Sequence, residues 1–507
     1  MRLCLVINYT DMFSDFTPIK YILKAIEIIV LYLALLFAGT GNAQAQSGNT
    51  VEKIDRYLTA KMASNKIPSL AVAVVHSDSV IFSKGYGVTS DGKAVNADTP
   101  FPIASLSKAF TGVAVMQLVE EGKVVLDSPV VKYIPSFEID DPRGASITVS
   151  QLLHQTSGLA DTGFPDMTFK QQATNLDEVI VLLKKAKLVS KPGETFHYHN
   201  PNYEILAKLV EAVSGERFSS YLENHIFNPL EMNYTWDVPN TKSLYKEGIA
   251  KGYTFFVGEP IVAKDPEWFV DGAAGVVSSS NDMANWLRVQ LNKGRFKDIE
   301  LLSAEGFALT HKAQSGNESS YAMGWNLNRD SSLYHGGILW TYSSEQMIYT
   351  NDGYGIVVLF NSGIKPLVDY YSFVDGIHEI LKGQEPDVSS LPHWFFQVCG
   401  FLVFLIAFGF AVRRIFRVKE WYQKYNKRPL WLSWSYLLLR LLPLILLLSM
   451  SWITTMLSGR ILSWDGIFLM MSDFILGLGL IALANVLVVF VRLRYLFRNY
   501  KGSVAAL

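Results

Sequence analysis

The sequence predicts an α+β domain followed by a membrane region, and the α+β class rests on strands near both ends of the domain with helices between them. Residues 69–87, SLAVAVVHSDSVIFSKGYG, have the apolar runs and central turn of a β-hairpin. Near the other end, residues 344–352 (SEQMIYTND) and 353–363 (GYGIVVLFNSG) have the same character. Between them, residues 111–122 (TGVAVMQLVEEG) predict a helix that ends at a glycine. The terminal segments are therefore expected to share one antiparallel sheet.

The last part of the chain is apolar and carries its charges asymmetrically. Three runs, residues 393–412, 430–457 and 467–491, are each long and apolar enough to cross a bilayer. Lys and Arg are concentrated between the first and second runs and after the third, whereas the loop between the second and third holds only Arg460 and Asp465. Since basic loops stay on the cytoplasmic side, the sequence predicts a multi-pass cell-membrane protein with a cytoplasmic C-terminus and an extracytoplasmic folded domain.

The N-terminal segment has the pattern of a secretory signal. Lys20 and Lys24 precede an apolar run over residues 28–38, and small residues follow this run. The pattern predicts a signal peptide, with an uncleaved membrane anchor as the alternative. The chain is thus expected to divide into a signal peptide (1–46), a folded domain (47–390) and a membrane region in contact with lipid (391–507).

Composition narrows the classes of partner. The chain of 507 residues has 45 Lys and Arg against 46 Asp and Glu. The sequence of the folded domain has no cluster of basic residues that would form a positively charged surface for nucleic acid. Cys4 precedes the first apolar run and Cys399 lies inside a later one. The sequence therefore predicts neither nucleic-acid binding nor a disulfide framework or cysteine metal site.

A serine and a lysine three residues apart are the first candidates for chemistry. The pattern SxxK starts at Ser90, Ser105, Ser243 and Ser362, but only Ser105 stands at the head of a clear helical run. In a helix, residues three apart share a face, so the Lys108 amine would lie beside the serine hydroxyl. Backbone N–H groups at a helix start also stabilise a negative oxygen. The arrangement indicates an activated serine nucleophile, with an N-terminal serine cap and a solvated lysine as the alternative.

A YxN motif offers partners for this pair. Tyr198 and Asn200 precede a predicted helix that begins near Asn202. A tyrosine beside a lysine ammonium can have a lowered pKa and act as a general base. Asparagine has donors and acceptors that can orient a substrate amide and the lysine. Taken alone, YxN is a weak signal, and a partly buried tyrosine with a bonded hydroxyl is the commoner explanation.

A third element, His335-Gly336-Gly337, lies in a predicted strand. Glycines weaken a strand but let another backbone approach closely, as a bound peptide-like ligand would require. By itself the element indicates no more than a strand end.

Together, in this order and at these intervals, the three elements resemble the motifs of the serine β-lactamase and penicillin-binding protein superfamily. Residues 147–161, 224–235 and 272–287 look like further landmarks of that family, and the resemblance covers about residues 51–383. YxN is typical of the branch with class C β-lactamases, DD-peptidases, D-amino-acid peptidases and related esterases. The resemblance implies a β-lactamase/transpeptidase-like fold, with an antiparallel sheet flanked by helices plus an all-helical subdomain.

The resemblance also implies roles for individual residues. Ser105 would be the nucleophile that forms an acyl-enzyme, with Lys108 and Tyr198 handling its proton. The backbone N–H groups of Ser105 and Ile338 would form the oxyanion hole, and no metal or other cofactor is needed. The implied substrate-binding positions are Asn200, His335, Gly336, Gly337 and Ile338.

This chain departs from the family's KTG motif, because His335 stands where the lysine would be. A histidine is charged only part of the time near pH 7, so it would hold a substrate carboxylate weakly and in a pH-dependent way. Trp340 and Thr341 also stand where relatives often have a Gly-rich segment. HxG occurs in some DD-peptidases and in many lactamase-like esterases or peptidases, which makes a true β-lactamase less expected.

The sequence thus predicts a membrane-anchored, extracytoplasmic serine hydrolase that acts on D-amino-acid peptides of the cell wall, with β-lactams as further candidate ligands. An esterase is one alternative. A membrane sensor or assembly protein is another, suggested by Arg440 and Asp473 within the apolar runs. Structural or exposed roles, and no zinc site, are expected for three histidines: His154, His197 and His199. His199 is expected to face away from the nucleophile, because it is the middle residue of YxN.

Overall fold

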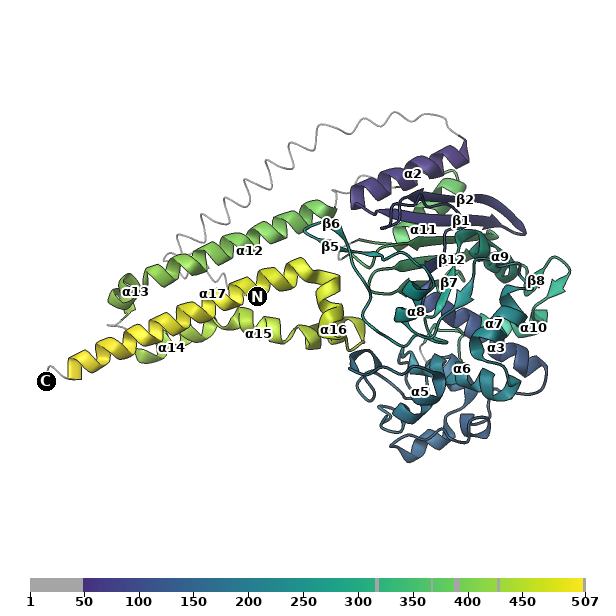
Figure 1. The fold of residues 1–507 in the computed structure, drawn as a ribbon, viewed down its shortest axis with the longest axis horizontal. Helices are drawn as coiled ribbons and strands as arrows, with labels where there is room; N and C mark the ends of the chain where they lie inside the picture. Colours follow the sequence, from purple (N-terminus) through teal and green to yellow (C-terminus); the bar gives the residue numbers. More distant parts are fainter. Residues whose placement is uncertain (1–48, 315–318, 366–367, 387–392, 426–428, 505–507) are drawn as a thin grey trace, which may run out of the picture. The chain divides into compact units, whose positions relative to one another are not determined.

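The computed structural model describes residues 49–314, 319–365, 368–386, 393–425 and 429–504, so the predicted signal peptide lies outside the described residues. The folded domain is built on a six-stranded sheet in the order β10-β11-β12-β13-β1-β2, in which all neighbours are antiparallel (Figure 1). Its strands are β1 (Ser69–His76), β2 (Ser79–Gly87), β10 (Asn326–Leu327), β11 (Leu333–Ile338), β12 (Ser343–Tyr349) and β13 (Tyr354–Phe360).

Strand β1 joins the two ends of the domain. It pairs with β2 in the predicted hairpin and with β13 on its other side, where Leu70 is opposite Phe360. Leu70 and Val72 belong to one hydrophobic cluster and Ala71 and Ala73 to another, so both faces of the strand are buried. A strand covered on both faces is apolar at successive positions, which explains the unbroken run in the sequence. The predicted α+β class and the shared sheet are confirmed.

Helices cover both faces of this sheet (Figure 1). On one face, α2 (Thr50–Asn65) and α11 (Tyr371–Leu381) pack together and against the strands. On the other face, α9 (Ser280–Leu291) packs against β1 and β13 and leads into the helical part of the domain. That part contains α3 (Ser107–Glu120), α4 (Val149–Leu153), α5 (Leu176–Leu183), α6 (Pro201–Ser214), α7 (Phe218–Leu222), α8 (Thr241–Lys246) and α10 (Ala304–Thr310).

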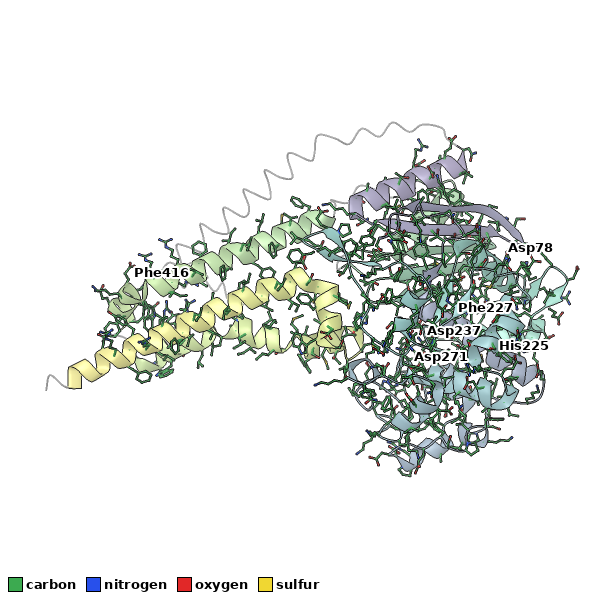
Figure 2. All side chains as sticks on the ribbon, viewed as in Figure 1. Asp78, His225, Phe227, Asp237, Asp271 and Phe416 are labelled. Atoms are coloured by element: carbon green, nitrogen blue, oxygen red, sulfur yellow. The ribbon has the colours of Figure 1, made fainter. Side chains whose placement is uncertain are left out.

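Helix α3 is the buried centre of the domain. Phe110 stacks on Trp286 of α9 with 3.8 Å between ring centroids, and Phe227, labelled in Figure 2, meets it edge-on at 5.6 Å. Such aromatic contacts add to the area that each ring buries. The start of α3 is therefore held rigidly, which matters because it carries the SxxK motif. The small sheets nearby are β3 (Phe101–Pro102) with β7 (Val276–Ser278) and β4 (Trp236–Asp237), β5 (Tyr253–Phe256) with β6 (Glu259–Val262), and β8 (Arg295–Phe296) with β9 (Ile299–Glu300).

The C-terminal region is helical. Its helices are α12 (His393–Phe416), α13 (Val418–Tyr425), α14 (Leu430–Leu439), α15 (Leu442–Leu448), α16 (Met450–Ser458) and α17 (Trp464–Val504), of which α12 and α15 pack against α17 (Figure 1). Within the described residues, Gln397–Phe416 and Trp464–Asn499 are long and apolar enough to cross a membrane. A third crossing exists only if the bent pair Trp431–Leu439 and Leu442–Leu448, 42° apart, acts as one span.

The second and third predicted runs differ from continuous spans. Residues 430–457 were expected as one helix but form α14, α15 and α16. Pro443 stands in the first turn of α15 and has no N–H to bond to the preceding turn, which explains the break after α14. Residues 467–491 lie within the longer α17, which has a non-helical backbone at Met471 (φ −146°, ψ 47°).

Candidate active site

Ser105 lies in a short 3-10 turn, Ala104–Leu106, directly before α3. The sequence predicted that the helix begins at this serine, whereas α3 begins two residues later, at Ser107. Ala104 has a φ of +49°, which residues other than glycine rarely adopt. Ser107 stabilises this turn, because its hydroxyl donates to the Ala104 carbonyl at 2.6 Å and accepts from the Val276 N–H at 3.0 Å. Backbone strain thus lies immediately before the candidate nucleophile, as is common at functional sites.

Lys108 is fully buried, and its amine meets three oxygen atoms. Its Nζ lies 3.3 Å from Ser105 Oγ, 2.9 Å from Asn200 Oδ1 and 2.8 Å from the Ala273 carbonyl oxygen. Burial, followed by the positive charge of Arg460, lowers the pKa of Lys108 well below its usual value. A neutral amine can donate to Asn200 and Ala273 and still turn its lone pair to the serine hydroxyl. The arrangement is that of a base beside its nucleophile.

The Tyr198 ring lies beside the same amine, with its centroid 4.8 Å from Lys108 Nζ. Burial raises the pKa of Tyr198 to about 12, and nearby Ser105 and Arg460 offset only part of this rise. The expectation of a lowered tyrosine pKa is therefore wrong, because burial outweighs the effects of Ser105 and Arg460. The hydroxyl forms no hydrogen bond of ordinary geometry within the described part of the chain. It remains protonated and available to a substrate or to the serine.

Gln155 holds the YxN segment in place. Its carbonyl accepts from the His197 N–H at 2.8 Å, and its Oε1 accepts from the His199 N–H at 3.0 Å. Because these bonds anchor alternate residues, Tyr198 and Asn200 turn to the other side of the segment, toward α3. Asn200 is 2 % exposed and immediately precedes α6. Two of the sequence-predicted residues are thus brought to the lysine.

His335 is buried in β11 and is held by neighbouring groups. Its Nδ1 lies 2.7 Å from the Gly336 carbonyl oxygen and its Nε2 lies 3.3 Å from the Tyr321 hydroxyl. Burial, and then the charge of Lys108, lowers the pKa of His335 to about 3. The expectation of a partly charged histidine near pH 7 is therefore wrong, because its surroundings exclude water. His335 supplies no cation at the position of the family's lysine.

Gly337 allows β11 to approach the chain just before the candidate nucleophile. A Cβ at this position would lie 2.3 Å from the Ile103 carbonyl oxygen and 2.2 Å from Ser344 Oγ. The need for glycine therefore comes from packing inside the protein, and not only from a ligand. Ile338 follows at the end of β11, next to the turn that holds Ser105, and its side chain is exposed. Its backbone remains the expected second donor of an oxyanion hole.

An arginine from the C-terminal region also reaches this site, and the sequence motifs did not single it out. Arg460 lies between α16 and α17, with its Nε 2.8 Å from Asp161 Oδ1 and its Nη2 3.1 Å from Asp166 Oδ1. The Ile461 N–H donates to Asp161 Oδ2 at 2.7 Å. The guanidinium carbon lies 5.9 Å from the ring centroid of Tyr198. The available signal was its position as the single basic residue of the loop predicted to lie outside.

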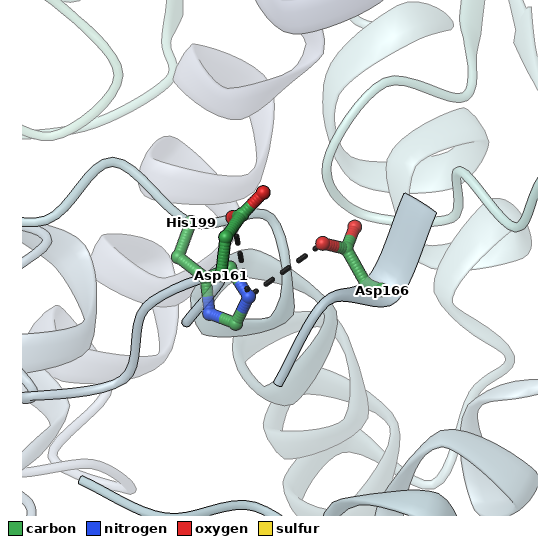
Figure 3. Close-up of side chains that lie close together, drawn as sticks. All are labelled: Asp161, Asp166 and His199. Atoms are coloured by element: carbon green, nitrogen blue, oxygen red, sulfur yellow. Dashed lines mark ion pairs between the residues drawn. The ribbon is translucent and has the colours of Figure 1, made fainter. Parts of the chain in front are cut away.

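His199 joins the same two carboxylates (Figure 3). Its Nε2 lies 3.6 Å from both Asp161 Oδ1 and Asp166 Oδ1, and 2.9 Å from the Phe164 carbonyl oxygen. A histidine with two carboxylates has the donor types of a metal site. In this structure, however, the Arg460 guanidinium contacts both carboxylates. The sequence predicts only that His199 faces away from the nucleophile, and the contacts of its ring lie in the 161–166 segment.

An SxxK serine with a buried lysine, set before a central helix against an antiparallel sheet, is the arrangement of the penicillin-binding class of serine hydrolases. The chain belongs to the Beta-lactamase family, whose family model matches residues 54–369.

Named relatives agree with this assignment. Protein flp of Staphylococcus aureus strain N315 is 32% identical over 327 residues, covering 62% of this chain and 64% of flp, so the chain spans less than two thirds of that relative. The "Putative D-alanyl-D-alanine carboxypeptidase" of Escherichia coli K12 is 24% identical over 355 residues, covering 60% of this chain and 81% of that protein. The octameric penicillin-binding protein homologue from Pyrococcus abyssi matches 68% of this chain and 80% of its own, with 26% identity and a TM-score of 0.56.

Proposed function

We propose that this protein is a membrane-anchored, extracytoplasmic serine hydrolase that forms an acyl-enzyme at Ser105 and acts on D-amino-acid peptides of the cell wall. The observation that carries the proposal is the 3.3 Å contact between Lys108 Nζ and Ser105 Oγ. The lysine is buried and its pKa is lowered, so it can accept the serine proton. The similarity to a protein described as a carboxypeptidase supports the substrate class.

The reaction would run in two halves. Ser105 Oγ attacks the substrate carbonyl while its proton passes to Lys108, and the backbone N–H groups of Ser105 and Ile338 stabilise the oxyanion. The C–N bond then breaks, and the leaving amine takes a proton from the Tyr198 hydroxyl, which regains one from Lys108. Water attacks the acyl-serine in the second half, releasing the acid and restoring the serine hydroxyl.

An esterase is the second candidate, and His335 is the observation that favours it. A peptide substrate ending in a carboxylate would be held by a cation at this position, but the pKa of His335 is lowered to about 3. An uncharged acyl or alcohol group needs no cation, so a neutral imidazole can bind it without leaving a carboxylate unpaired. The two candidates share the acyl-serine and differ in the leaving group.

The contact of Arg460 with Asp161 supports the proposed topology. Because the α16–α17 loop bonds to the folded domain, both lie on the same side of a membrane crossed by α17. The basic residues after α12 and at the end of α17 favour the cytoplasm for the opposite side. A cysteine placed at Ser463 should react with a membrane-impermeant maleimide on intact cells, and one placed at Lys419 should not. The reverse pattern would reject the topology.

Labelling the full-length protein in detergent tests the chemistry. A fluorescent penicillin and a chromogenic short-chain ester are compared on wild type, Ser105→Ala and Ser90→Ala, the last from a surface SxxK whose hydroxyl donates to the Lys251 carbonyl. Wild type and Ser90→Ala should react, and Ser105→Ala should not. Reaction that survives in Ser105→Ala rejects the nucleophile.

The pattern of reaction separates the candidates. Labelling with slow release, together with cleavage of a D-Ala-D-Ala peptide, supports the peptidase. Ester turnover without penicillin labelling supports the esterase. Stable labelling without turnover of either substrate class indicates a sensor that uses the same fold.

A further inference from the structure

The α16–α17 loop, residues 459–463, is held against the folded domain by more than ion pairs. Leu462 packs with Trp340 in a small hydrophobic cluster. Farther along α17, Ser472 Oγ donates to the Phe255 carbonyl at 3.2 Å. Apolar and polar contacts therefore hold both the loop and the start of α17 against the folded domain. Arg460 is one of several residues that make these contacts.

Arg460 and its two partners are buried together. The side chains of Arg460, Asp161 and Asp166 are 13%, 1% and 7% exposed. Removing one member of a buried ion pair leaves an uncompensated charge, which is strongly unfavourable. The two carboxylates of the folded domain thus depend on the loop for their arginine partner.

A chain of polar contacts leads from Arg460 to the candidate nucleophile. Asp166 bonds to Arg460 on one side, and its Oδ1 lies 3.6 Å from Nε2 of His199, the residue directly before Asn200. The Asn200 Oδ1 accepts from Lys108 at 2.9 Å, and the lysine in turn meets Ser105. The arginine charge also favours the neutral form of Lys108. Each step involves a side chain with little freedom to move, since all but the serine are buried or nearly so.

We propose that the α16–α17 loop is a component of the acylation site and that Arg460 is its positioning residue. It holds Asp166 and, through His199, the neighbouring Asn200, so that Lys108 faces Ser105. This inference rests on the proposed acyl-serine chemistry. The membrane region then does more than anchor the domain, because acylation depends on the docked loop.

The first test measures the acylation rate against pH for full-length protein in detergent. Arg460→Gln removes the positive charge and Arg460→Lys retains it. Arg498→Gln is the control, because it makes the same Arg-to-Gln change near the far end of α17. In Arg460→Gln we expect the rate at pH 7 to fall by about tenfold, the usual cost of losing one charge-assisted contact. The rising limb of its profile should move to higher pH, because Lys108 then keeps its proton longer.

The controls decide between positioning and folding. Arg460→Lys should restore most of the wild-type profile, and Arg498→Gln should match wild type throughout. Thermal unfolding of each variant is recorded in parallel. If Arg460→Gln keeps the wild-type pH profile and is only less stable, the arginine is structural and the proposal is overturned.

A second test does not depend on activity. In protein with Cys4→Ser and Cys399→Ser, Asp161→Cys is paired with Ile461→Cys, whose N–H lies 2.7 Å from Asp161 Oδ2. This pair should form a disulfide under mild oxidation, and Asp161→Cys with Arg498→Cys should not. Absence of the first crosslink overturns the proposal. Wild type that neither labels nor turns over substrate would reject the proposed function, while the crosslink would still decide whether the loop docks.

Discussion

Lys108 and Asn200 are 92 residues apart in the chain, yet their Nζ and Oδ1 atoms meet at 2.9 Å. The contact ties the first turn of α3 to the residue before α6, so two separate helices set the position of one amine. Asn200 is therefore a partner of the lysine in the resting protein, in addition to its expected role toward substrate.

Replacing Lys108 by arginine should abolish most acylation. A guanidinium keeps its proton at any working pH, so Lys108→Arg cannot accept the proton of Ser105. We expect the rate of labelling to fall by about 10²- to 10⁴-fold, the usual contribution of a general base. The time course of labelling by a fluorescent penicillin measures it, with Lys93→Arg from a surface SxxK as the control. A wild-type rate in Lys108→Arg would contradict the assigned base.

Tyr198→Phe should separate activity from stability. The ring beside Lys108 is retained, and the lost hydroxyl has no hydrogen-bond partner within the described residues. The free energy of unfolding should therefore stay the same or rise, whereas acylation should slow by about 10²-fold. Urea unfolding and labelling kinetics measure the two effects.

The matched control is Tyr203→Phe. The Tyr203 hydroxyl donates to the Leu153 carbonyl at 2.7 Å, so its loss should cost about 1 kcal/mol of stability and leave acylation unchanged. Equal labelling rates in Tyr198→Phe and wild type would remove Tyr198 from the proton path.

His335 should make the protein less stable in acid. Its pKa is lowered to about 3 from an ordinary 6.5, so in this window the unfolded chain binds a proton that the folded protein excludes. The contribution of neutral His335 to the free energy of unfolding is fully present above pH 6.5 and is lost as the pH falls toward 3. Between pH 7.5 and 5, the free energy of unfolding should therefore drop further in wild type than in His335→Gln. Urea unfolding measures this free energy, and an equal drop in wild type and His335→Gln would contradict the prediction. His76→Gln, at an exposed histidine, is the control.

Asp237 and Asp271, both labelled in Figure 2, have buried carboxyl oxygens, and each carboxyl affects the pKa of the other. The pH dependence of this pair is opposite to that of His335. Burial, the largest cause, raises the pKa of Asp271 to about 7 from 3.8. The folded protein thus holds the extra proton between these values, and this contribution to stability is lost as the pH rises from about 4 to 7. Asp237→Asn should reduce the loss, because an amide can donate to the remaining carboxylate.

Urea unfolding at pH 5 and pH 8 measures the effect of Asp237→Asn, with exposed Asp78→Asn as the control. An unchanged difference between the two pH values would show that the pair does not share its proton. Asp271 directly precedes Gly272 and Ala273, whose carbonyls accept from Thr111 and Lys108. Its titration therefore bears on the segment that supports the lysine.

Much of the site could be predicted because its chemistry lies in short motifs. Ser105 and Lys108 are three residues apart, so local helical geometry is enough to bring them together. The meeting of Tyr198, Asn200 and His335 with that pair came from resemblance to a family, since no local pattern predicts such distant contacts. The strands at residues 69–87 and 353–363 were predictable for the same local reason, from apolar runs between turns.

The pKa values could not be predicted in this way. The sequence predicts a lowered pKa for Tyr198, beside a lysine, and a partly charged His335, at the position of the family's lysine. Both predictions are wrong. Burial raises the pKa of one and lowers that of the other. Desolvation depends on every atom packed around a group, and these atoms come from distant segments of the chain.

The sequence by itself determined the SxxK pair, the strand-rich ends of the domain, the apolar C-terminal runs and the exceptional place of Arg460 in a loop poor in basic residues. Only the tertiary structure decided what that arginine does. It meets Asp166, 294 residues earlier in the chain, and no periodicity or motif spans such a distance. The contact forms because the packing of α17 and the preceding loop against the folded domain brings opposite charges together where water is excluded, and there an unpaired charge would be costly.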